Sequence, residues 1–289
     1  MEKAVRLTNL INVTSVISIH YFEFDKNFRF HGEEHDFWEL VYVDSGNVIV
    51  TADEKMHILG QGEIIFHKPN EFHTISADGK KPTNVCVICF ETKSKAMKCF
   101  QDKKMFLPKE FRYYIKTIIV EGRKTFALPV NDPYADVIKL LDKPVVGGLQ
   151  IIKTSLEQLL IMLMRIIEGE SYRKTALIER DCGNSIVNKI KKILNDNVYG
   201  KISVYEICQN LSYSKTYLSK VFNENMGCSI IDYYTTLKIN EAKKLIRERN
   251  YTFTEISNML QFNDPHYFSK VFKKVVNMSP REYLQSVTI

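Results

Sequence analysis

Apolar and polar residues alternate over short runs in the first third of the chain, which is the pattern of half-buried β-strands. Residues that form turns separate these runs, at 44–47, 59–62 and 69–70. Many short strands at regular spacing are typical of a sandwich or a barrel. The strands that the pattern predicts are residues 16–24, 37–43, 47–52, 63–66, 72–76 and 84–90.

The pattern changes to a helical period in the middle of the chain. A helix is predicted around residues 111–121, and turn formers follow between 128 and 148. Two apolar stripes then lie on one long helix, the first at Leu149, Ile152, Leu156, Leu159, Leu163 and Ile166, the second at Leu160, Met164 and Ile167. The first stripe has the spacing of a short coiled coil, so one stripe can pack on the strands and the other on a second copy of the chain. An ordinary core helix accounts for the same spacing.

The last third of the chain contains an internal repeat. The sequence Tyr-Leu-Ser-Lys-Val-Phe at 217–222 recurs as Tyr-Phe-Ser-Lys-Val-Phe at 267–272, so the two segments differ at one position only. Upstream of each segment lies a pair of apolar residues four apart. The first pair is Ile207 and Leu211, and the second is Ile256 and Leu260.

Each repeat predicts two helices joined by a tight turn. The second helix begins at Ser214 or Asp264, whose side-chain oxygens can cap free backbone N–H groups. Pro265 follows at the first helical position, where its missing N–H is tolerated. The apolar residues of these second helices form one buried face, made of Leu218, Val221 and Phe222 in the first repeat and Phe268, Val271 and Phe272 in the second.

The other face of each second helix is polar. Such a helix-turn-helix can place its second helix in the major groove of DNA, where Lys, Ser, Thr and Asn bond to base edges or phosphates. A long helix over 231–248 would connect the two units and fix their spacing, which on one side of B-DNA is about 34 Å. The candidate DNA-contacting residues are Lys215, Thr216, Ser219, Lys220 and Asn223 in the first unit and His266, Ser269, Lys270 and Lys273 in the second.

The positive charge of the chain is concentrated in the same region. The net charge is +6, yet residues 1–184 hold 25 Lys and Arg against 25 Asp and Glu, whereas residues 185–289 hold 15 against 9. This distribution predicts that only the C-terminal part contacts a polyanion, although a basic surface can also serve solubility alone.

The composition is that of a globular protein in a reducing compartment. Apolar residues make up 45%, enough for packed cores, and six scattered cysteines suit the cytoplasm. Cys86 and Cys89 face opposite sides of a predicted strand, which favours buried apolar residues over a redox or zinc pair. No secretory signal is recognised. Lys153, Glu157 and Arg165 interrupt the longest apolar stretch, so we expect a cytoplasmic protein with no membrane association.

The segment 185–289 resembles the DNA-binding domain of the AraC/XylS family of bacterial transcription regulators. The matching pieces are residues 214–222, 232–234, 264–274 and 278–283. The resemblance implies that base-facing side chains stand at Thr216, Ser219, Lys220, His266, Ser269 and Lys270. The chain departs from the family at Gln261, where a Gly is usual, and at Lys238, where an Arg is common.

The N-terminal segment resembles the two motifs of cupins, the jelly-roll barrels that serve as sensor domains in many such regulators. His35, Glu39 and Gly46 fit the first motif, and Gly62 and His73 fit the second. In metal cupins, two His and a Glu of the first motif and a His of the second hold the ion. Here the first His position is Glu33, and Asn70 stands at a Gly position, where Asn tolerates the left-handed backbone.

Three interpretations of the polar cluster remain open. Glu33, His35, Glu39 and His73 could bind a catalytic metal ion. The same region could bind a small polar effector, or its polar residues could be barrel-mouth residues that bond only to one another. We favour an effector site without metal or other cofactor, made of His35, Trp38, Glu39 and His73, with Phe66 and Phe72 nearby. A sugar would suit it, because polar groups bond hydroxyls while aromatic rings stack on the sugar ring.

These patterns predict an α+β multidomain chain, with an N-terminal β-barrel of the cupin or jelly-roll type, a helical extension and a C-terminal all-α domain. The function expected is sequence-specific binding of promoter or operator DNA by a homodimer that activates transcription, with RNA polymerase as a further partner. An enzyme built on a metal cupin and an adaptor that binds protein are the alternatives. The expected parts are a cupin-like effector-binding domain at 1–125, a helical dimerisation segment at 126–172, a linker at 173–184, and a DNA-binding domain at 185–289 with helix-turn-helix units at about 203–226 and 253–276.

Overall fold

The computed structural model describes residues 4–128, 138–169 and 184–287. The chain divides into two compact units, the first made of residues 1–173 and 286–289 and the second of residues 174–285. Most of the predicted linker, and with it Cys182, lies outside the described residues. No described helix has the length and apolar content that crossing a membrane requires.

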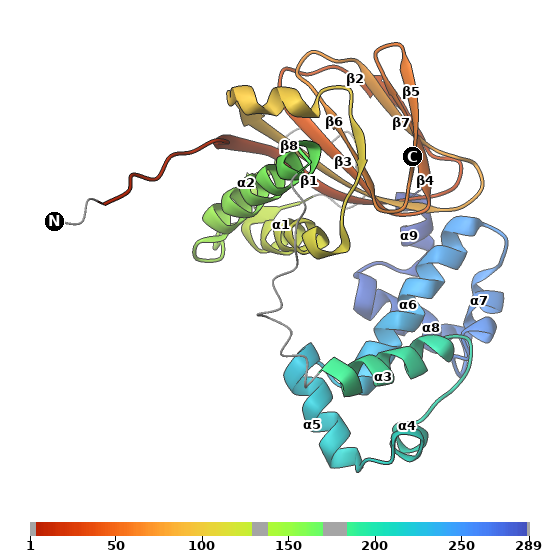
Figure 1. Cartoon of the computed structure of the whole chain (residues 1–289). Helices are drawn as coiled ribbons and strands as arrows, with labels where there is room; N and C mark the ends of the chain where they lie inside the picture. The colour runs from red at the N-terminus through yellow and green to blue at the C-terminus, as the bar shows by residue number, and fades with distance from the viewer. Residues whose placement is uncertain (1–3, 129–137, 170–183, 288–289) are drawn as a thin grey trace. The chain divides into compact units, whose positions relative to one another are not determined.

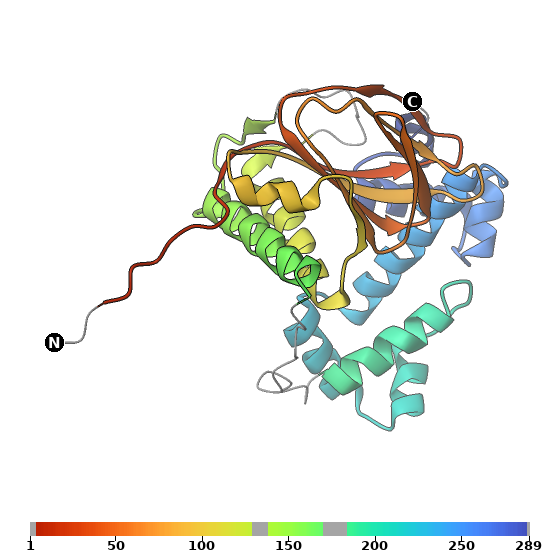
Figure 2. The ribbon, with the colours of Figure 1, turned by 45° about the horizontal axis from the view of Figure 1, so that its top comes forward.

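The first unit is built on two antiparallel sheets that enclose an apolar interior (Figures 1 and 2). The larger sheet has the strand order β1-β8-β3-β6-β9, and the smaller has the order β2-β7-β4-β5. A short ribbon pairs β10 with β11. The strands are β1 (Val13–Phe24), β2 (Arg29–Glu33), β3 (Trp38–Ser45), β4 (Asn47–Ala52), β5 (Lys55–Gly60), β6 (Glu63–His67), β7 (His73–Ala77), β8 (Thr83–Thr92), β9 (Lys104–Phe106), β10 (Phe126–Ala127) and β11 (Lys139–Leu140).

All six predicted strands are confirmed, with ends that shift by a few residues. The sequence pattern did not predict β2, β5, β9, β10 or β11. In β2 and β5 most residues are at least partly exposed, so these strands carry little apolar periodicity to detect. Asn70 has a φ of 60°, which confirms the predicted left-handed turn before β7.

Side chains of β3 alternate between two apolar cores, one on each face of the larger sheet. Val41 and Val43 point into the space between the sheets, whereas Leu40 and Tyr42 point to the outer face. Cys86 and Cys89 of β8 likewise belong to opposite cores, as predicted. The outer face is covered by helices α1 (Arg112–Thr125) and α2 (Gly148–Ile167), and the short helices η1 (Lys95–Phe100) and η2 (Lys109–Phe111) precede them.

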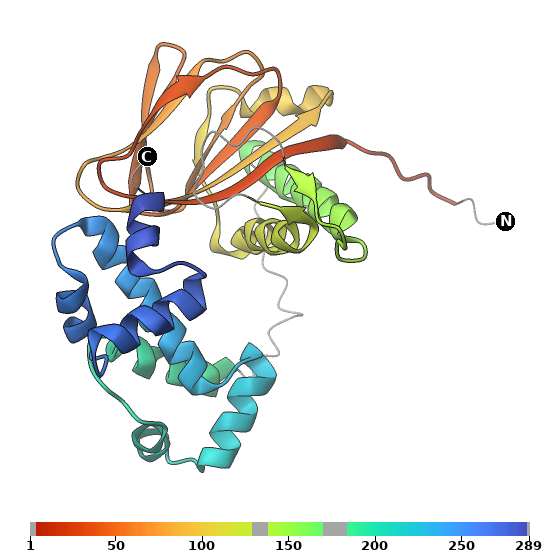
Figure 3. The ribbon, with the colours of Figure 1, turned by 180° about the vertical axis from the view of Figure 1, so that it is seen from behind.

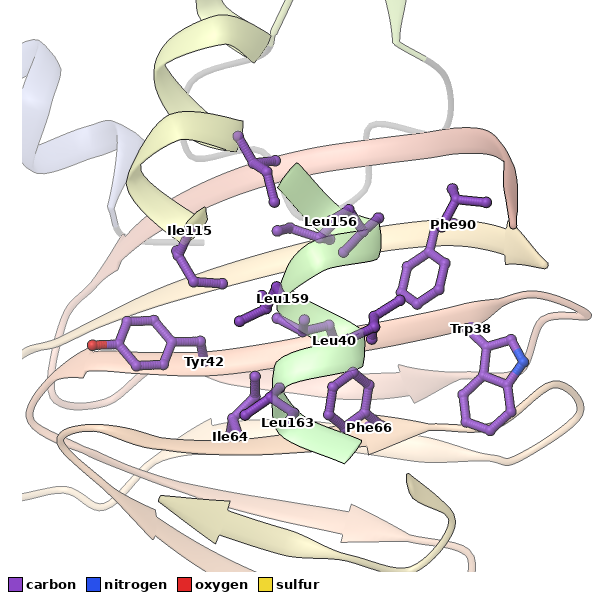
Figure 4. Close-up of a cluster of buried hydrophobic side chains, with 14 of the residues drawn as sticks. Trp38, Leu40, Tyr42, Ile64, Phe66, Phe90, Ile115, Leu156, Leu159 and Leu163 are labelled. Carbon is purple, nitrogen blue, oxygen red and sulfur yellow. The ribbon is translucent and has the colours of Figure 1, made fainter. Parts of the chain in front are cut away.

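The long helix α2 buries most residues of both apolar stripes inside the first unit, although Leu149 at its start is exposed. Leu156, Leu159 and Leu163 lie over the sheet (Figure 4). Leu160 and Met164 of the second stripe are also buried, with exposed fractions of 0% and 7%. The expectation that one stripe packs on the strands and the other on a second copy is therefore not met, because residues of both stripes are buried in the core that α1, α2 and the larger sheet share.

The second unit is entirely helical among its described residues (Figure 3). It contains two helix-turn-helix units, α4 with α5 and α7 with α8, and the central helix α6 contacts α5, α7 and α8. The sequence analysis did not foresee α3, which packs on α5. The helices are α3 (Asn184–Asp196), α4 (Val204–Leu211), α5 (Lys215–Met226), α6 (Ile230–Glu248), α7 (Phe253–Met259), α8 (Pro265–Val276) and α9 (Pro280–Ser286).

The predicted caps begin the second helix of each unit. The side chain of Ser214 accepts a hydrogen bond from the Tyr217 N–H, and that of Asp264 accepts one from the Tyr267 N–H. The turn before each helix passes through a left-handed residue, Ser212 with φ 58° or Gln261 with φ 55°. A Gly is usual at the latter position in the family because only Gly adopts this conformation without strain.

Candidate functional site

The polar faces of α5 and α8 are open to solvent, as contact with DNA requires. Leu218 and Phe222 anchor α5, and Phe268 and Phe272 anchor α8, because all four are fully buried. The opposite faces expose nearly every residue proposed to contact DNA, namely Lys215, Thr216, Ser219, Lys220 and Asn223 on α5 and His266, Lys270 and Lys273 on α8. Their role as DNA contacts stays a prediction.

Ser269 differs from the other residues of this set. It is half-buried, and its hydroxyl donates a hydrogen bond of 2.9 Å to the carbonyl oxygen of Pro265 in the same helix. The hydroxyl can still accept a hydrogen bond, but its proton is already used. Ser269 is therefore the weakest candidate on α8, whereas the side chains of His266, Lys270 and Lys273 are exposed.

An exposed tyrosine lies in the first turn of each second helix, and neither was among the predicted contacts. Tyr217 and Tyr267 occupy equivalent places in the repeat, with exposed fractions of 44% and 50%. The ring of Tyr213 stacks on that of Tyr217 at 5.2 Å between centroids. Tyrosine hydroxyls are common donors to DNA phosphates. The sequence signal that could have identified these tyrosines is that both stand at the first position of the repeated segment.

A second candidate site is a pocket of ≈ 170 Å³ between the two sheets of the first unit. Glu39 of β3 and His73 of β7 supply its polar wall. Its apolar wall carries the aromatic rings of Phe22, Phe24, Phe30 and Phe37. The aromatic residues Phe22 and Phe24 of β1 and Phe30 of β2 were not predicted to belong to the site.

The proposed assignment of Trp38 to this pocket is wrong. Trp38 is 6% exposed and belongs to the core under the helices, together with Leu40 and Tyr42 (Figure 4). Neighbouring residues on a strand face opposite sides, so Trp38 cannot share the face of Glu39. Phe66 lies in the same outer core, and Phe72 does not line the pocket.

The structure brings the predicted polar residues together around Glu39. The Nε2 atom of His35 lies 3.5 Å from one carboxylate oxygen of Glu39, and the Nε2 atom of His73 lies 3.6 Å from the other. Glu33 approaches His73 at 3.8 Å. Both Nε2 atoms are buried and have no hydrogen-bond partner in the part of the chain that the structure describes, because these separations exceed hydrogen-bond length.

Backbone carbonyls fix the orientation of both imidazole rings. The Nδ1 atom of His35 lies 3.1 Å from the carbonyl oxygen of Phe37, and that of His73 lies 2.9 Å from the carbonyl oxygen of Glu71. With Nδ1 held in this way, each ring presents Nε2 to Glu39. Burial lowers the pKa of His73, but the carboxylates of Glu33 and Glu39 outweigh it and raise this pKa to about 10.

A buried pair of polar side chains supports the site from behind. His67 and Glu71 are 1% and 3% exposed, and the Nδ1 atom of His67 lies 2.8 Å from the Glu71 carboxylate. The His67 ring stacks on the His73 ring at 4.2 Å between centroids. Burial raises the pKa of Glu71, but hydrogen bonds from His67 and Lys68 outweigh it and lower this pKa to about 2. Neither His67 nor Glu71 was among the residues predicted for the site.

The four polar residues also satisfy the donor requirement of a transition-metal site. One ligand atom from each of Glu33, His35, Glu39 and His73 lies within 4.8 Å of all the others. Two imidazole nitrogens and two carboxylate oxygens suit zinc, iron or manganese. The cluster can thus bind either an ion or the hydroxyls of a polar molecule.

Comparisons with known proteins match both units separately. The family model described as AraC-like ligand binding domain matches residues 17–94, and a helix-turn-helix domain model matches residues 207–286. The Msm operon regulatory protein of Streptococcus mutans is 24% identical over 96% of this chain and 99% of its own. The lactose operon transcription activator of Staphylococcus xylosus is 27% identical over 42% of this chain and 43% of its own. A solved structure of ToxT from Vibrio cholerae is 16% identical over 95% of this chain and 100% of its own, with a TM-score of 0.36.

Proposed function

The chain belongs to the AraC/XylS family of DNA-binding transcription regulators, and on this premise we propose that it activates transcription when a small polar effector binds between its two sheets. The observation that supports this most is the Glu39 cluster. It places the Glu39 carboxylate and the Nε2 atom of His73, which has no hydrogen-bond partner among the described residues, against an aromatic-lined pocket. Such groups bind a polar molecule that also has an apolar face.

A sugar fits this pocket best. Hydroxyl groups can pair with Nε2 of His73 and the Glu39 carboxylate, while a ring face stacks on one of the phenylalanines. The name of one relative points the same way, since that protein activates a lactose operon.

Regulation requires that the effector bind two arrangements of the protein unequally. We propose that the arrangements differ in how a homodimer presents its two pairs of recognition helices to the promoter, and that the DNA-bound form contacts RNA polymerase. The residues that would read bases are those exposed on α5 and α8. Chemistry on the effector forms no part of this proposal.

The experiment begins with the DNA and proceeds to the effector. Genomic fragments from the encoding organism that the full-length chain retains identify its operator, and the neighbouring genes suggest the effector class. A panel of neutral mono- and disaccharides is then tested for a rise in melting temperature. A ligand at about 100 times its Kd stabilises the folded protein by about 2.7 kcal/mol.

A matched pair of variants locates the binding site. Glu39→Gln should abolish the thermal response, because it removes the charge shared by His35 and His73. Glu54→Gln, at an exposed residue in a turn, should leave it intact. Thermal responses of equal size in both variants would refute an effector site at Glu39.

A metal ion is the second candidate occupant of this cluster, favoured by the 4.8 Å spread of its four ligand atoms. Elemental analysis of the purified full-length chain tests it. One equivalent of iron, manganese or zinc that is lost in both His35→Ala and His73→Ala would assign the cluster to a metal. Substoichiometric metal in the parent chain would favour the effector site.

A further inference from the structure

A pocket of ≈ 490 Å³ opens on the outer face of the larger sheet, beside helix α1. It is formed by α1 together with Tyr21 of β1 and Tyr42 and Asp44 of β3. Tyr42 follows Glu39 by three positions on the same strand and points to the opposite face, so this pocket is separate from the effector site. Every residue that lines it belongs to the first unit.

Two buried donors in this pocket have no hydrogen-bond partner among the described residues. Tyr42 is 2% exposed and its hydroxyl oxygen is unpaired, and the Nε atom of Arg112 is buried and unpaired as well. The Tyr42 hydroxyl points away from the surrounding apolar cluster (Figure 4). Buried polar groups nearly always have a hydrogen-bond partner. Two neighbouring donors without one therefore indicate that a bound molecule supplies the acceptor.

The acceptor is not supplied by Asp44. Its carboxylate already accepts a hydrogen bond of 2.6 Å from the Tyr21 hydroxyl, and that hydroxyl accepts one from Asn84. This neighbouring tyrosine shows how a hydroxyl at the sheet surface is satisfied when a carboxylate is within reach. Tyr42 lacks an equivalent, although it lines the same pocket.

Helix α1 makes the pocket both cationic and apolar. Arg112, Lys116 and Arg123 recur at helical spacing and all line it, against the single carboxylate of Asp44. Ile119 and Val120, one turn after Lys116 on α1, form an apolar part of the pocket lining. The volume lies within the range of small-molecule sites, so the pocket can hold a whole organic molecule and not only an ion.

We propose that this pocket is a second ligand site, which binds an organic acid with an apolar body. Its carboxylate accepts hydrogen bonds from the Tyr42 hydroxyl and Arg112 Nε and pairs with Lys116, while the apolar body lies along Ile119 and Val120. A carboxylate matches the planar guanidinium and accepts from several donors at once. The site gives the sensor unit a second input, independent of the Glu39 cluster.

Calorimetric titration of the full-length chain with octanoate tests this proposal, with acetate and 1-octanol as the matched anion and apolar probes. We expect octanoate to bind at least about tenfold more tightly than either, a difference of about 1.4 kcal/mol. Tyr42→Phe removes only the hydroxyl and should weaken octanoate binding about tenfold. The variant should stay folded, because the unpaired hydroxyl makes no hydrogen bond within the protein that the substitution would remove.

A charge-matched pair controls for general electrostatics. Lys116→Met removes a charge from the pocket, and Lys109→Met removes one from an exposed residue outside it. Only Lys116→Met should weaken octanoate binding. The proposal is overturned if octanoate does not bind, if Tyr42→Phe binds it as the parent does, or if the two lysine variants lose affinity equally.

Discussion

The ammonium group of Lys238 donates a hydrogen bond of 2.6 Å to the carbonyl oxygen of Leu260, at the end of α7. The same group donates a second bond of 2.6 Å to the carbonyl oxygen of Gly200, in the loop before α4. One buried side chain of α6 therefore connects the two helix-turn-helix units. The rings of Tyr234 and Phe262 flank it at 4.8 Å and 5.9 Å, and burial lowers its pKa to about 8.

Replacing Lys238 should destabilise the second unit. Lys238→Met leaves the carbonyl oxygens of Gly200 and Leu260 without their donor, which costs about 2–3 kcal/mol. Urea unfolding followed by circular dichroism at a helical wavelength measures this loss. Lys238→Arg restores the donors with the residue common in the family and should recover most of the stability. Equal losses in both variants would contradict a hydrogen-bonding role.

A glycine at Gln261 should stabilise the same unit. Gln261 holds a φ of 55°, a strained conformation for a residue with a Cβ atom. We expect Gln261→Gly to raise the free energy of unfolding by about 0.5–1 kcal/mol. Gln261→Ala keeps the strain and removes only the side-chain bond to the Asn258 carbonyl, so it should give no gain. A gain in the alanine variant would show that strain is not the cause.

The two recognition helices should differ in what they read. The polar residues Thr216 and Asn223 of α5 can bond to bases, whereas Lys270 and Lys273 of α8 suit phosphates. Asn223→Ala should therefore reduce discrimination between the operator and a scrambled duplex. Lys273→Ala should weaken binding to both duplexes alike. It should also reduce the slope of the logarithm of affinity against the logarithm of salt concentration by about one. Equal loss of discrimination in both variants would contradict this asymmetry.

Acid should destabilise the first unit through Glu71. Its pKa is lowered to about 2 from an ordinary value of 4.5, so the native state keeps it ionised when the unfolded state binds a proton. The resulting stabilisation is complete above about pH 4.5 and is lost as the pH falls toward 2. The single tryptophan, Trp38, lies in this unit and reports its unfolding. Glu71→Gln should reduce the loss of unfolding free energy between pH 4.5 and pH 2. An unchanged pH dependence in this variant would refute the assignment to Glu71.

The sequence predicted the second unit closely because repetition and capping are local signals. Ser214 and Asp264 cap the helices they were expected to cap, and the apolar residues at their cores are buried. What it could not supply was the role of Lys238, since both carbonyl oxygens that it contacts are distant in the chain and have no sequence signature.

The polar cluster of the first unit was predicted in part. Motif spacing brought His35, Glu39 and His73 together correctly. Trp38 was misplaced because closeness in sequence was taken for closeness in space, although strand alternation puts it on the far face from Glu39. The stripes of α2 were misjudged for another reason, since periodicity shows that a face is buried but not what covers it.

Equilibrium binding of the full-length chain to its selected operator and to a scrambled duplex, measured over a range of salt concentrations, tests the central claim that α5 and α8 recognise DNA. We expect a preference of about a thousandfold or more for the operator, and affinity that falls steeply with salt. Lys220→Ala and Lys270→Ala should each weaken operator binding by about 1–3 kcal/mol. Binding without preference at low salt, or parental affinity in both variants, would contradict the account.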